Sequence, residues 1–368
     1  MAAPEPIKII IAGGGTGGHL YPGIALAQEF QKRRKAEIMF IGTAYGIESR
    51  VLPKLPYGFK KIWMRGLQRK LSIGNMLFPL RLMVSIFQCA YLILTFRPNV
   101  VIGTGGYVSG PALMTAIVLG VPTVIQEQNS YPGLVNRLLG NRVKQMHLTY
   151  EETLKYFKKQ ANIYVSGNPV RSALGGQDKQ MAMKKFNLQE NKTTLFIFGG
   201  SQGARAINQK VMSCVDRLMS LNDLQILWAT GSYDFDVIES ECRRYAEDIS
   251  IQPFIEDMPS AYAAADFVLC RAGASTLSEI TACGLPAILV PYPYSTAGHQ
   301  EFNARTLEKA GAAFVILEQS LVESVLIEAI SELLTNPEKR KAMSQAACKL
   351  SKPKAAAEIV GKIETLLV

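Results

Sequence analysis

A run of glycines near the amino terminus brings together residue types that could bind an anion and move a proton. Residues 13–19 read GGGTGGH, follow an apolar run at residues 7–12, and precede a helix-like stretch at residues 22–30. A strand, a glycine turn and a helix in this order direct backbone N–H groups and the positive helix end toward an anion. His19 adds an imidazole that can exchange protons near neutral pH. The alternative is a tight strand-to-helix turn that holds no ligand.

The same glycines match a dinucleotide-binding fingerprint. Gly13, Gly15 and Gly18 satisfy the G-x-G-x-x-G spacing. A nicotinamide site also needs an acidic residue at the end of the second strand. Here the predicted second strand, residues 38–41, runs into Gly-Thr-Ala, and Glu48 comes too late. The sequence therefore disfavours a nicotinamide-dependent oxidoreductase.

A second group of candidate residues lies at a helix start in the carboxyl-terminal half. Ser275 and Thr276 open a predicted helix whose free N–H groups could hold a diphosphate without a metal. Glu279, one turn later, could accept hydrogen bonds from the two hydroxyls of a ribose. Alternatively, Glu279 could belong to a capping box with Ser275 or Thr276 as the N-cap. Arg171 and Ser201 could also bind phosphate oxygens.

Short apolar strands that alternate with helices must position these residues. Predicted strands of the first half lie at residues 7–12, 38–41, 100–102, 122–125, 146–148 and 162–165, and those of the second half at 195–198, 225–228, 250–252, 267–270 and 287–290. This alternation predicts α/β domains with doubly wound parallel sheets, facing each other across a cleft. Ligands in such folds bind beyond the carboxyl ends of the strands. Residues 167–171 form a predicted hinge between domains at 1–168 and 169–350.

The composition sets broader limits. A chain of 368 residues, 48% apolar and 19% charged, is long enough for two globular domains. The net charge of +10 predicts an anionic partner. The six cysteines form no C-x-x-C pair, which indicates free thiols in a reducing cytoplasm and disfavours a zinc site. Residues 1–8 contain no basic leader or cleavage signal, so no export is expected.

The positive charge is concentrated in one interval. Residues 49–126 contain no Asp or Glu but include Arg50, Lys54, Lys60, Lys61, Arg65, Arg69, Lys70, Arg81 and Arg97. The apolar segment 76–96 in this interval is interrupted at Pro79, Arg81 and Gln88, so its uninterrupted part is too short for a transmembrane helix. Basic residues beside an apolar helix predict a surface that lies on an anionic membrane leaflet.

The alternative for the apolar segment is a buried crossover helix at residues 82–94. We expect the membrane-facing and the buried interpretations each to hold in part, with one helix face in the core and residues 71–80 exposed. The aromatic residues do not match a nucleic-acid-binding module, so no nucleic-acid partner is expected.

Six motifs occur together and in order, and their combination is specific where each motif alone is not. They are GGTGGH at 14–19, GTGGY at 103–107, EQN at 127–129, GNPVR at 167–171, GGSQG at 199–203 and RAGASTLSE at 271–279. With these motifs, which span nearly the whole sequence, the chain resembles the MurG family of peptidoglycan N-acetylglucosaminyltransferases.

The resemblance implies a GT-B fold, with a last helix within residues 351–368 that crosses back to the first domain. It implies an inverting, metal-independent transfer of N-acetylglucosamine from UDP-N-acetylglucosamine to the C4 hydroxyl of the muramyl sugar of lipid I, which gives lipid II. It also implies a peripheral position on the cytoplasmic face of the bacterial inner membrane, against anionic lipid, and no cofactor.

The resemblance further assigns residues to the donor, UDP-N-acetylglucosamine. These are Thr16, Gly17, Gly18, Asn129, Arg171, Ser201, Ile255, Ala274, Ser275, Thr276, Leu277, Ser278, Glu279 and Gln300. In this set Ile255 would present its backbone to the uracil, Glu279 would hold the ribose, and Gln300 would bind sugar hydroxyls. His19 is the predicted general base, because the attacking hydroxyl must lose a proton, and Glu127 is a weaker candidate that assists it.

Two positions depart from the family pattern. The family often has a histidine before the EQN motif, where this chain has Gln126, and the loop at 294–300, which ends at the donor candidate Gln300, is variable in the family. His147, within a predicted strand, is expected to be a core histidine. His299 is less well placed than His19 to act as the base. Two further function classes remain open: a sugar transferase with a soluble or glycolipid acceptor, and a non-catalytic protein of the membrane surface.

Overall fold

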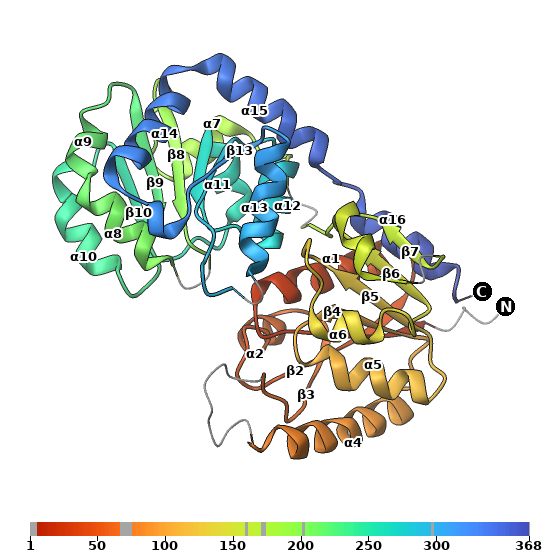
Figure 1. Cartoon of the computed structure of the whole chain (residues 1–368). Helices are drawn as coiled ribbons and strands as arrows, with labels where there is room; N and C mark the ends of the chain where they lie inside the picture. The colour runs from red at the N-terminus through yellow and green to blue at the C-terminus, as the bar shows by residue number, and fades with distance from the viewer. Residues whose placement is uncertain are drawn as a thin grey trace. The chain divides into compact units, whose positions relative to one another are not determined.

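The computed structural model describes residues 6–66, 76–158, 161–170, 174–200, 203–295 and 298–367. The chain divides into two compact units, each with its own sheet (Figure 1). Unit 1 comprises Met1–Arg171 and Lys352–Val368, and unit 2 comprises Ser172–Ser351. The last segment of the chain therefore folds with the first unit.

Unit 1 is built on a seven-stranded parallel sheet with the strand order β3-β2-β1-β4-β5-β6-β7. Its strands are β1 (Ile7–Gly13), β2 (Ala36–Gly42), β3 (Gly58–Lys61), β4 (Val100–Gly105), β5 (Thr123–Glu127), β6 (Gln145–Leu148) and β7 (Ile163–Val165). The order reverses between β1 and β4, so the carboxyl ends of these neighbours form the ligand-binding point of such a sheet.

Helices cover both faces of this sheet because its strands are apolar on both sides. Ile9 and Ile11 of β1 pack toward α1 (Gly17–Arg33) and α16 (Ala355–Glu364), whereas Ile10 packs toward the opposite face. On that opposite face lie α4 (Phe78–Phe96), α5 (Ser109–Val118) and α6 (Leu134–Leu139) (Figure 1). The remaining short elements are α2 (Glu48–Val51), η1 (Leu52–Lys54) and η2 (Glu151–Tyr156).

Unit 2 repeats the plan with six parallel strands in the order β10-β9-β8-β11-β12-β13. They are β8 (Thr193–Phe198), β9 (Leu224–Ala229), β10 (Ile249–Gln252), β11 (Phe267–Cys270), β12 (Ala287–Leu289) and β13 (Ala313–Val315). The order reverses between β8 and β11. The glycine turn after β8 and the helix start after β11 therefore lie at neighbouring strand ends.

Unit 2 also has an apolar core on each face of its sheet. Its helices are α7 (Lys179–Lys185), α8 (Arg205–Ser213), α9 (Val215–Met219), α10 (Phe235–Cys242), η3 (Arg243–Tyr245), α11 (Met258–Ala264), α12 (Ala274–Ala282), α13 (His299–Lys309), η5 (Glu318–Ser320), α14 (Glu323–Thr335) and α15 (Pro337–Leu350).

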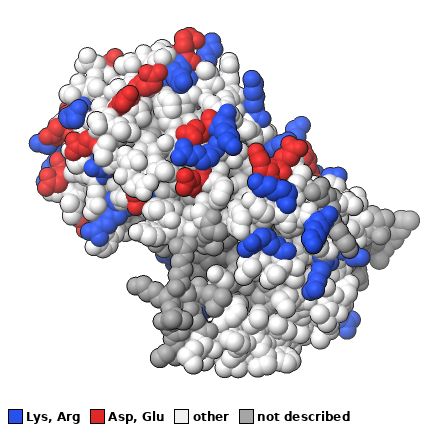
Figure 2. Space-filling view, viewed as in Figure 1, with Lys and Arg blue, Asp and Glu red and all other residues white. Residues whose placement is uncertain are grey.

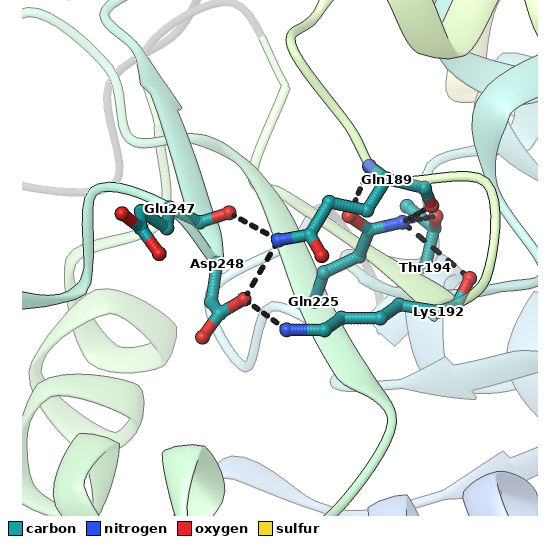
Figure 3. A network of polar contacts seen from close by, with 6 residues as sticks. All are labelled: Gln189, Lys192, Thr194, Gln225, Glu247 and Asp248. Atoms are coloured by element: carbon teal, nitrogen blue, oxygen red, sulfur yellow. Dashed lines mark hydrogen bonds and ion pairs between the residues drawn. The ribbon is translucent and has the colours of Figure 1, made fainter.

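A polar network closes the amino end of the second sheet (Figure 3). The Gln225 amide donates to the Gln189 carbonyl at 2.8 Å and to Thr194 Oγ1 at 2.9 Å, and its oxygen accepts the Gln189 N–H at 2.8 Å. Asp248 accepts from the Gln189 side chain and from Lys192. These side chains bond to one another at the strand starts, opposite the edge that carries the glycine turn.

The predicted pair of doubly wound parallel sheets is confirmed in both units. The strand prediction missed β3 and β13, which lie at sheet edges. β3 reads GFKK and is largely exposed, so it lacks the apolar run by which the buried strands were recognised. Residues 287–290 are accordingly not the end of the second sheet, because β13 pairs with β12.

Helix α4 packs one face into unit 1 and leaves an apolar stripe outside. Ser85, Cys89 and Ile93 recur at four-residue spacing and are buried. The stripe consists of Leu80, Met83, Phe87, Tyr91 and Leu94, all exposed. The expectation that one face lies in the core is thus confirmed. Of the predicted exposed segment, residues 71–75 lie outside the described residues, and within 76–80 only Phe78 is partly buried.

Candidate active site

The glycine turn after β1 is organised by a buried carboxylate. Glu48 is fully buried, and its oxygens accept the Gly15 N–H at 2.8 Å, the Thr43 N–H at 2.9 Å and the Thr43 hydroxyl at 2.8 Å. A Cβ at Gly14 would lie 2.5 Å from this carboxyl group, so only glycine leaves room for it. Glu48 therefore accepts the hydrogen bond of the Gly15 N–H, one of the turn amides that the sequence predicts could bind an external anion. Beyond Gly15, Thr16 is the N-cap of α1, which begins at Gly17.

His19 lies in the first turn of α1, against the carboxyl ends of β4 and β5. Thr104 Oγ1 donates to the His19 carbonyl at 2.8 Å, and His19 Nδ1 lies 3.0 Å from Gln128 Oε1. Gly105 has φ +105°, and a Cβ there would lie 2.5 Å from Nδ1. The imidazole is therefore held between a glycine turn and a buried amide. No residue in the described ranges forms a hydrogen bond to its Nε2.

Glu127, the second catalytic candidate, holds the loop after β5. Its Oε1 accepts the Asn129 N–H at 2.9 Å and the Asn129 side-chain amide at 3.1 Å. Its Oε2 accepts the Gly133 N–H and the Asn136 side-chain amide, each at 2.8 Å. These four N–H donors engage both oxygens of the buried carboxylate with the loop at residues 129–136. This geometry favours a structural role for Glu127, which orients Asn129, over direct assistance to His19.

In unit 2 the predicted diphosphate site is the start of α12. The helix begins at Ala274 after the N-cap Gly273, and Leu277 N–H is the first to return to the Gly273 carbonyl, at 2.9 Å. The N–H groups of Ala274, Ser275 and Thr276 therefore precede the helical hydrogen-bond ladder. Ser278 lies in the second turn, where its hydroxyl donates to the Ala274 carbonyl.

The structure excludes the capping-box alternative for Glu279. Gly273, rather than Ser275 or Thr276, is the N-cap, so Glu279 lies beyond the first turn. Its Oε2 accepts the Tyr262 hydroxyl at 2.9 Å, and the side chain is buried. This contact fixes the carboxylate against α11.

Of the remaining residues predicted to bind the nucleotide sugar, the structure describes some and not others. Ile255 is buried in the loop after β10, and Gln300 lies in the first turn of α13, where its oxygen accepts the Tyr292 N–H at 2.9 Å. Arg271 donates to the Val290 carbonyl at 3.2 Å, at the start of the loop that leads to Gln300. The candidates Arg171 and Ser201 lie outside the described residues.

His147 is a core residue, as the sequence predicted. It is fully buried in β6, shares a hydrogen bond between Nδ1 and Ser166 Oγ at 2.9 Å, and stacks on Tyr164. Burial, with a smaller contribution from the charge of Lys362, lowers the pKa of His147 from 6.5 to about 3.

This pKa shift predicts a loss of stability in acid. Between pH 6.5 and about 3 the unfolded histidine binds a proton and the native one does not, so lowering the pH favours unfolding. We expect His147 alone to reduce the unfolding free energy of unit 1 by up to about 1.4 kcal/mol per pH unit between pH 6 and 4. Urea titrations followed by Trp63 fluorescence, in a Trp228→Phe background, isolate this unit.

His147→Gln should flatten the acid dependence, and His299→Gln in unit 2 is the matched control. Equal slopes in the His147→Gln and parent proteins would contradict the assignment.

The six cysteines are all free, and burial raises the pKa of the Cys89 thiol to about 12. Within the described ranges no group of three or more His, Cys, Asp or Glu side chains is placed to hold a metal ion.

The sequence does not predict the roles of Glu48 and Gln128. In the sequence Glu48 is an acid that comes too late for a nicotinamide site, and Gln128 is one residue of the EQN motif. Each contacts a residue that is distant in the chain. Nothing in the sequence shows that Gly14 must be glycine because the Glu48 carboxyl group lies against it.

Comparisons with known proteins cover both units. The sequence model of the glycosyltransferase family 28 N-terminal domain matches residues 9–148, and that of the family's C-terminal domain matches residues 194–359. The chain is 42% identical over 368 residues to the UDP-N-acetylglucosamine–N-acetylmuramyl-(pentapeptide) pyrophosphoryl-undecaprenol N-acetylglucosamine transferase of Desulforamulus reducens, covering 98% of this chain and 99% of that protein. It is 40% identical over 366 residues to the protein of the same name from Halothermothrix orenii, covering 97% and 98% of the two chains.

Among solved structures, the crystal structure of Acinetobacter baumannii MurG is similar with a TM-score of 0.77 and 28% identity, over 98% of this chain and 100% of that one. A putative UDP-N-acetylglucosamine 2-epimerase from Listeria monocytogenes shares the fold, with a TM-score of 0.71 at 15% identity, over 98% and 96% of the two chains.

Proposed function

The chain belongs to glycosyltransferase family 28, and from this premise we propose that it transfers N-acetylglucosamine from UDP-N-acetylglucosamine to undecaprenyl-linked lipid I, giving lipid II for peptidoglycan synthesis. The observation that carries the proposal is the similarity to relatives whose names state this activity. These relatives match almost the whole chain at 40–42% identity. Both units carry glycine turns or helix starts at the carboxyl ends of their central strands, where such folds bind ligands.

Unit 2 would hold the nucleotide. The N–H groups at the start of α12, which precede the helical hydrogen-bond ladder, would receive the diphosphate, and the positive helix end would stabilise the charge that develops on UDP as it leaves. Glu279 would accept the ribose hydroxyls, the backbone at Ile255 would face the uracil, and Gln300 would bind the sugar. Ser201 and Arg171 complete the proposed donor set.

Unit 1 would supply the base and bind the acceptor. The C4 hydroxyl of the muramyl sugar would give its proton to His19 Nε2 while its oxygen attacks the anomeric carbon. The bond from that carbon to the diphosphate breaks, UDP leaves with the electron pair, and the configuration inverts. Thr16, Gly17 and Gly18, at the beginning of the same helix, would contact the donor, and Asn129 would do so from the loop that Glu127 holds.

Helix α4 would place the enzyme on the cytoplasmic membrane surface. By length and composition alone this 19-residue helix could cross a membrane. However, it packs its buried face into the core of unit 1, so we propose that it lies on the leaflet. The surface over α4 is largely free of charged side chains (Figure 2). Lys54, Lys60, Lys61 and Arg65 are exposed within the same acid-free interval and would attract anionic lipid.

This proposal predicts a loss of vesicle binding when the stripe is made polar. Phe87 and Tyr91 are each 69% exposed, and replacing both with serine should weaken binding to anionic vesicles by about 10-fold or more. Binding by the parent protein should fall as salt rises. Val237→Ser, at an exposed apolar position of unit 2, is the matched control in a flotation assay. Absence of binding by the parent protein at low salt would refute the proposal that this surface binds the membrane.

Transfer of labelled sugar from UDP-N-acetylglucosamine to lipid I, with EDTA present, tests the function directly. Lipid II formation supports the proposal. Transfer only to soluble or other glycolipid acceptors would establish the rival transferase class, and vesicle binding without UDP release would establish a non-catalytic surface protein.

A further inference from the structure

We infer that Gln128 is a positioning residue that fixes the neutral imidazole of His19 as the tautomer with a proton on Nδ1, leaving the lone pair on Nε2. Gln128 is buried and follows β5, and it contacts His19 across 109 residues of sequence. The inference concerns the free protein, and its catalytic consequence rests on the proposed function.

The orientation of the Gln128 amide follows from its other partners. Its Nε2 faces three acceptors, the Thr104 carbonyl at 2.6 Å, the Gln126 carbonyl at 3.1 Å and Gln126 Oε1, so its two N–H groups share them. Backbone carbonyls accept hydrogen bonds and cannot donate them. A flipped amide would place oxygen against these carbonyl oxygens, so the observed orientation is the one that satisfies the buried groups.

The orientation of the amide determines which ring nitrogen carries the proton. Gln128 Oε1, which can only accept, lies 3.0 Å from His19 Nδ1, so Nδ1 must be the donor. The donor chain continues outward, since Gln126 Nε2 lies 3.3 Å from Asn168 Oδ1. Each amide thus donates to the next in one direction, starting at the imidazole, and the bonds in such a chain polarise one another.

The backbone around His19 prevents the ring from choosing another partner. The hydroxyl of Thr104 holds the His19 carbonyl, and Gly105 leaves only enough space for the ring. In a neutral imidazole with Nδ1 protonated, Nε2 is the basic nitrogen. Gln128 therefore prepares Nε2 to take the proton of an attacking hydroxyl, and it does so without adding a negative charge beside the ring.

Nitrogen-15 NMR of the free protein tests the tautomer without any assay of activity. The chain has only three histidines, so the His19 signals can be assigned by their loss in His19→Asn. Long-range proton–nitrogen correlations at a pH where the ring is neutral should show a protonated Nδ1 and an unprotonated Nε2. The opposite pattern in the parent protein overturns the inference, and the His19→Asn variant is needed only to assign the signals.

Two substitutions isolate the oxygen that faces His19. Gln128→Glu and Gln128→Met both lose the N–H donors to Thr104, but only Gln128→Glu retains an acceptor toward Nδ1. We expect Gln128→Glu to keep the Nδ1–H tautomer and Gln128→Met to lose it. We expect kcat to fall on the order of 10²-fold in Gln128→Met and less in Gln128→Glu, with the affinity for UDP-N-acetylglucosamine retained in both. Equal tautomers and equal kcat in the two variants contradict the inference.

The assignment of His19 as the base and the inference that Gln128 positions its imidazole can be contradicted separately. If the tautomer responds as expected but His19→Asn retains turnover, His19 is not the base, and the role of Gln128 on the ring stands. If His19→Asn abolishes turnover but the tautomer of Gln128→Met is unchanged, the base stands and Gln128 does not position it.

Discussion

Replacing His19 with alanine is expected to lower kcat for sugar transfer by about 10³-fold, within the range that a positioned general base contributes. The affinity for UDP-N-acetylglucosamine should change little, because the ribose and diphosphate contacts are proposed for unit 2. Single-turnover transfer to lipid I, together with titration of nucleotide-sugar binding, separates the two quantities. Turnover at the parental rate in the alanine variant would remove His19 as the base.

The chain offers a matched control at this position. His19→Asn keeps a short side chain with an N–H that can reach Gln128 Oε1, but it has no basic nitrogen. Both variants should therefore lose turnover to a similar extent, while the asparagine variant keeps the contact between α1 and the end of β5. If only the alanine variant lost activity, the role of His19 would be to hold this contact and not to accept a proton.

The arrangement of the sheets was predictable because its signals are local. The run IKIIIAG of β1 and the run TTLFIF of β8 are apolar on both faces, and each leads into a glycine turn and a helix. Burial on both faces is what a parallel sheet requires, so the runs identify the central strands. β3 and β13 are edge strands with fewer buried residues, and the same signal is weak there.

The contacts that organise the turn after β1 were not predictable from spacing. Glu48 meets Gly15 across 33 residues, and His19 meets Gln128 across 109. Both contacts arise because β1, β2, β4 and β5 bring their carboxyl ends to one edge of the sheet. An order of strands can be inferred from the fold class, but the register that brings Gln128 Oε1 to the imidazole depends on the packing of the whole unit.

Glu48 also shows why a fingerprint alone misassigns this turn. In the sequence it is an acid too far along for a dinucleotide site, and in the structure its carboxylate is committed to Gly15 and Thr43. A fully buried carboxylate in that position opposes a second negative charge at the same amides. This arrangement argues against a diphosphate at the Gly15 amide and leaves the start of α12 as the better place for UDP.

Replacing Glu279 with alanine should weaken UDP binding by at least about 10²-fold, because hydrogen bonds to a charged group contribute about 1.5–3 kcal/mol each and two ribose hydroxyls would lose their carboxylate partner. Isothermal titration with UDP measures the change without the acceptor or the membrane. A melting curve of each variant checks that α12 still packs, since the same carboxylate accepts the Tyr262 hydroxyl.

Tyr262→Phe separates the two roles of this carboxylate, because it removes the internal donor at 2.9 Å and leaves Glu279 in place. If Glu279 binds ribose, Tyr262→Phe should retain most of the UDP affinity while Glu279→Ala loses it. If Glu279 serves only to anchor α12 to α11, the two variants should melt at similarly lowered temperatures and bind UDP alike. An unchanged affinity in Glu279→Ala would therefore move the ribose contact to another residue, and the diphosphate site at the start of α12 would still stand.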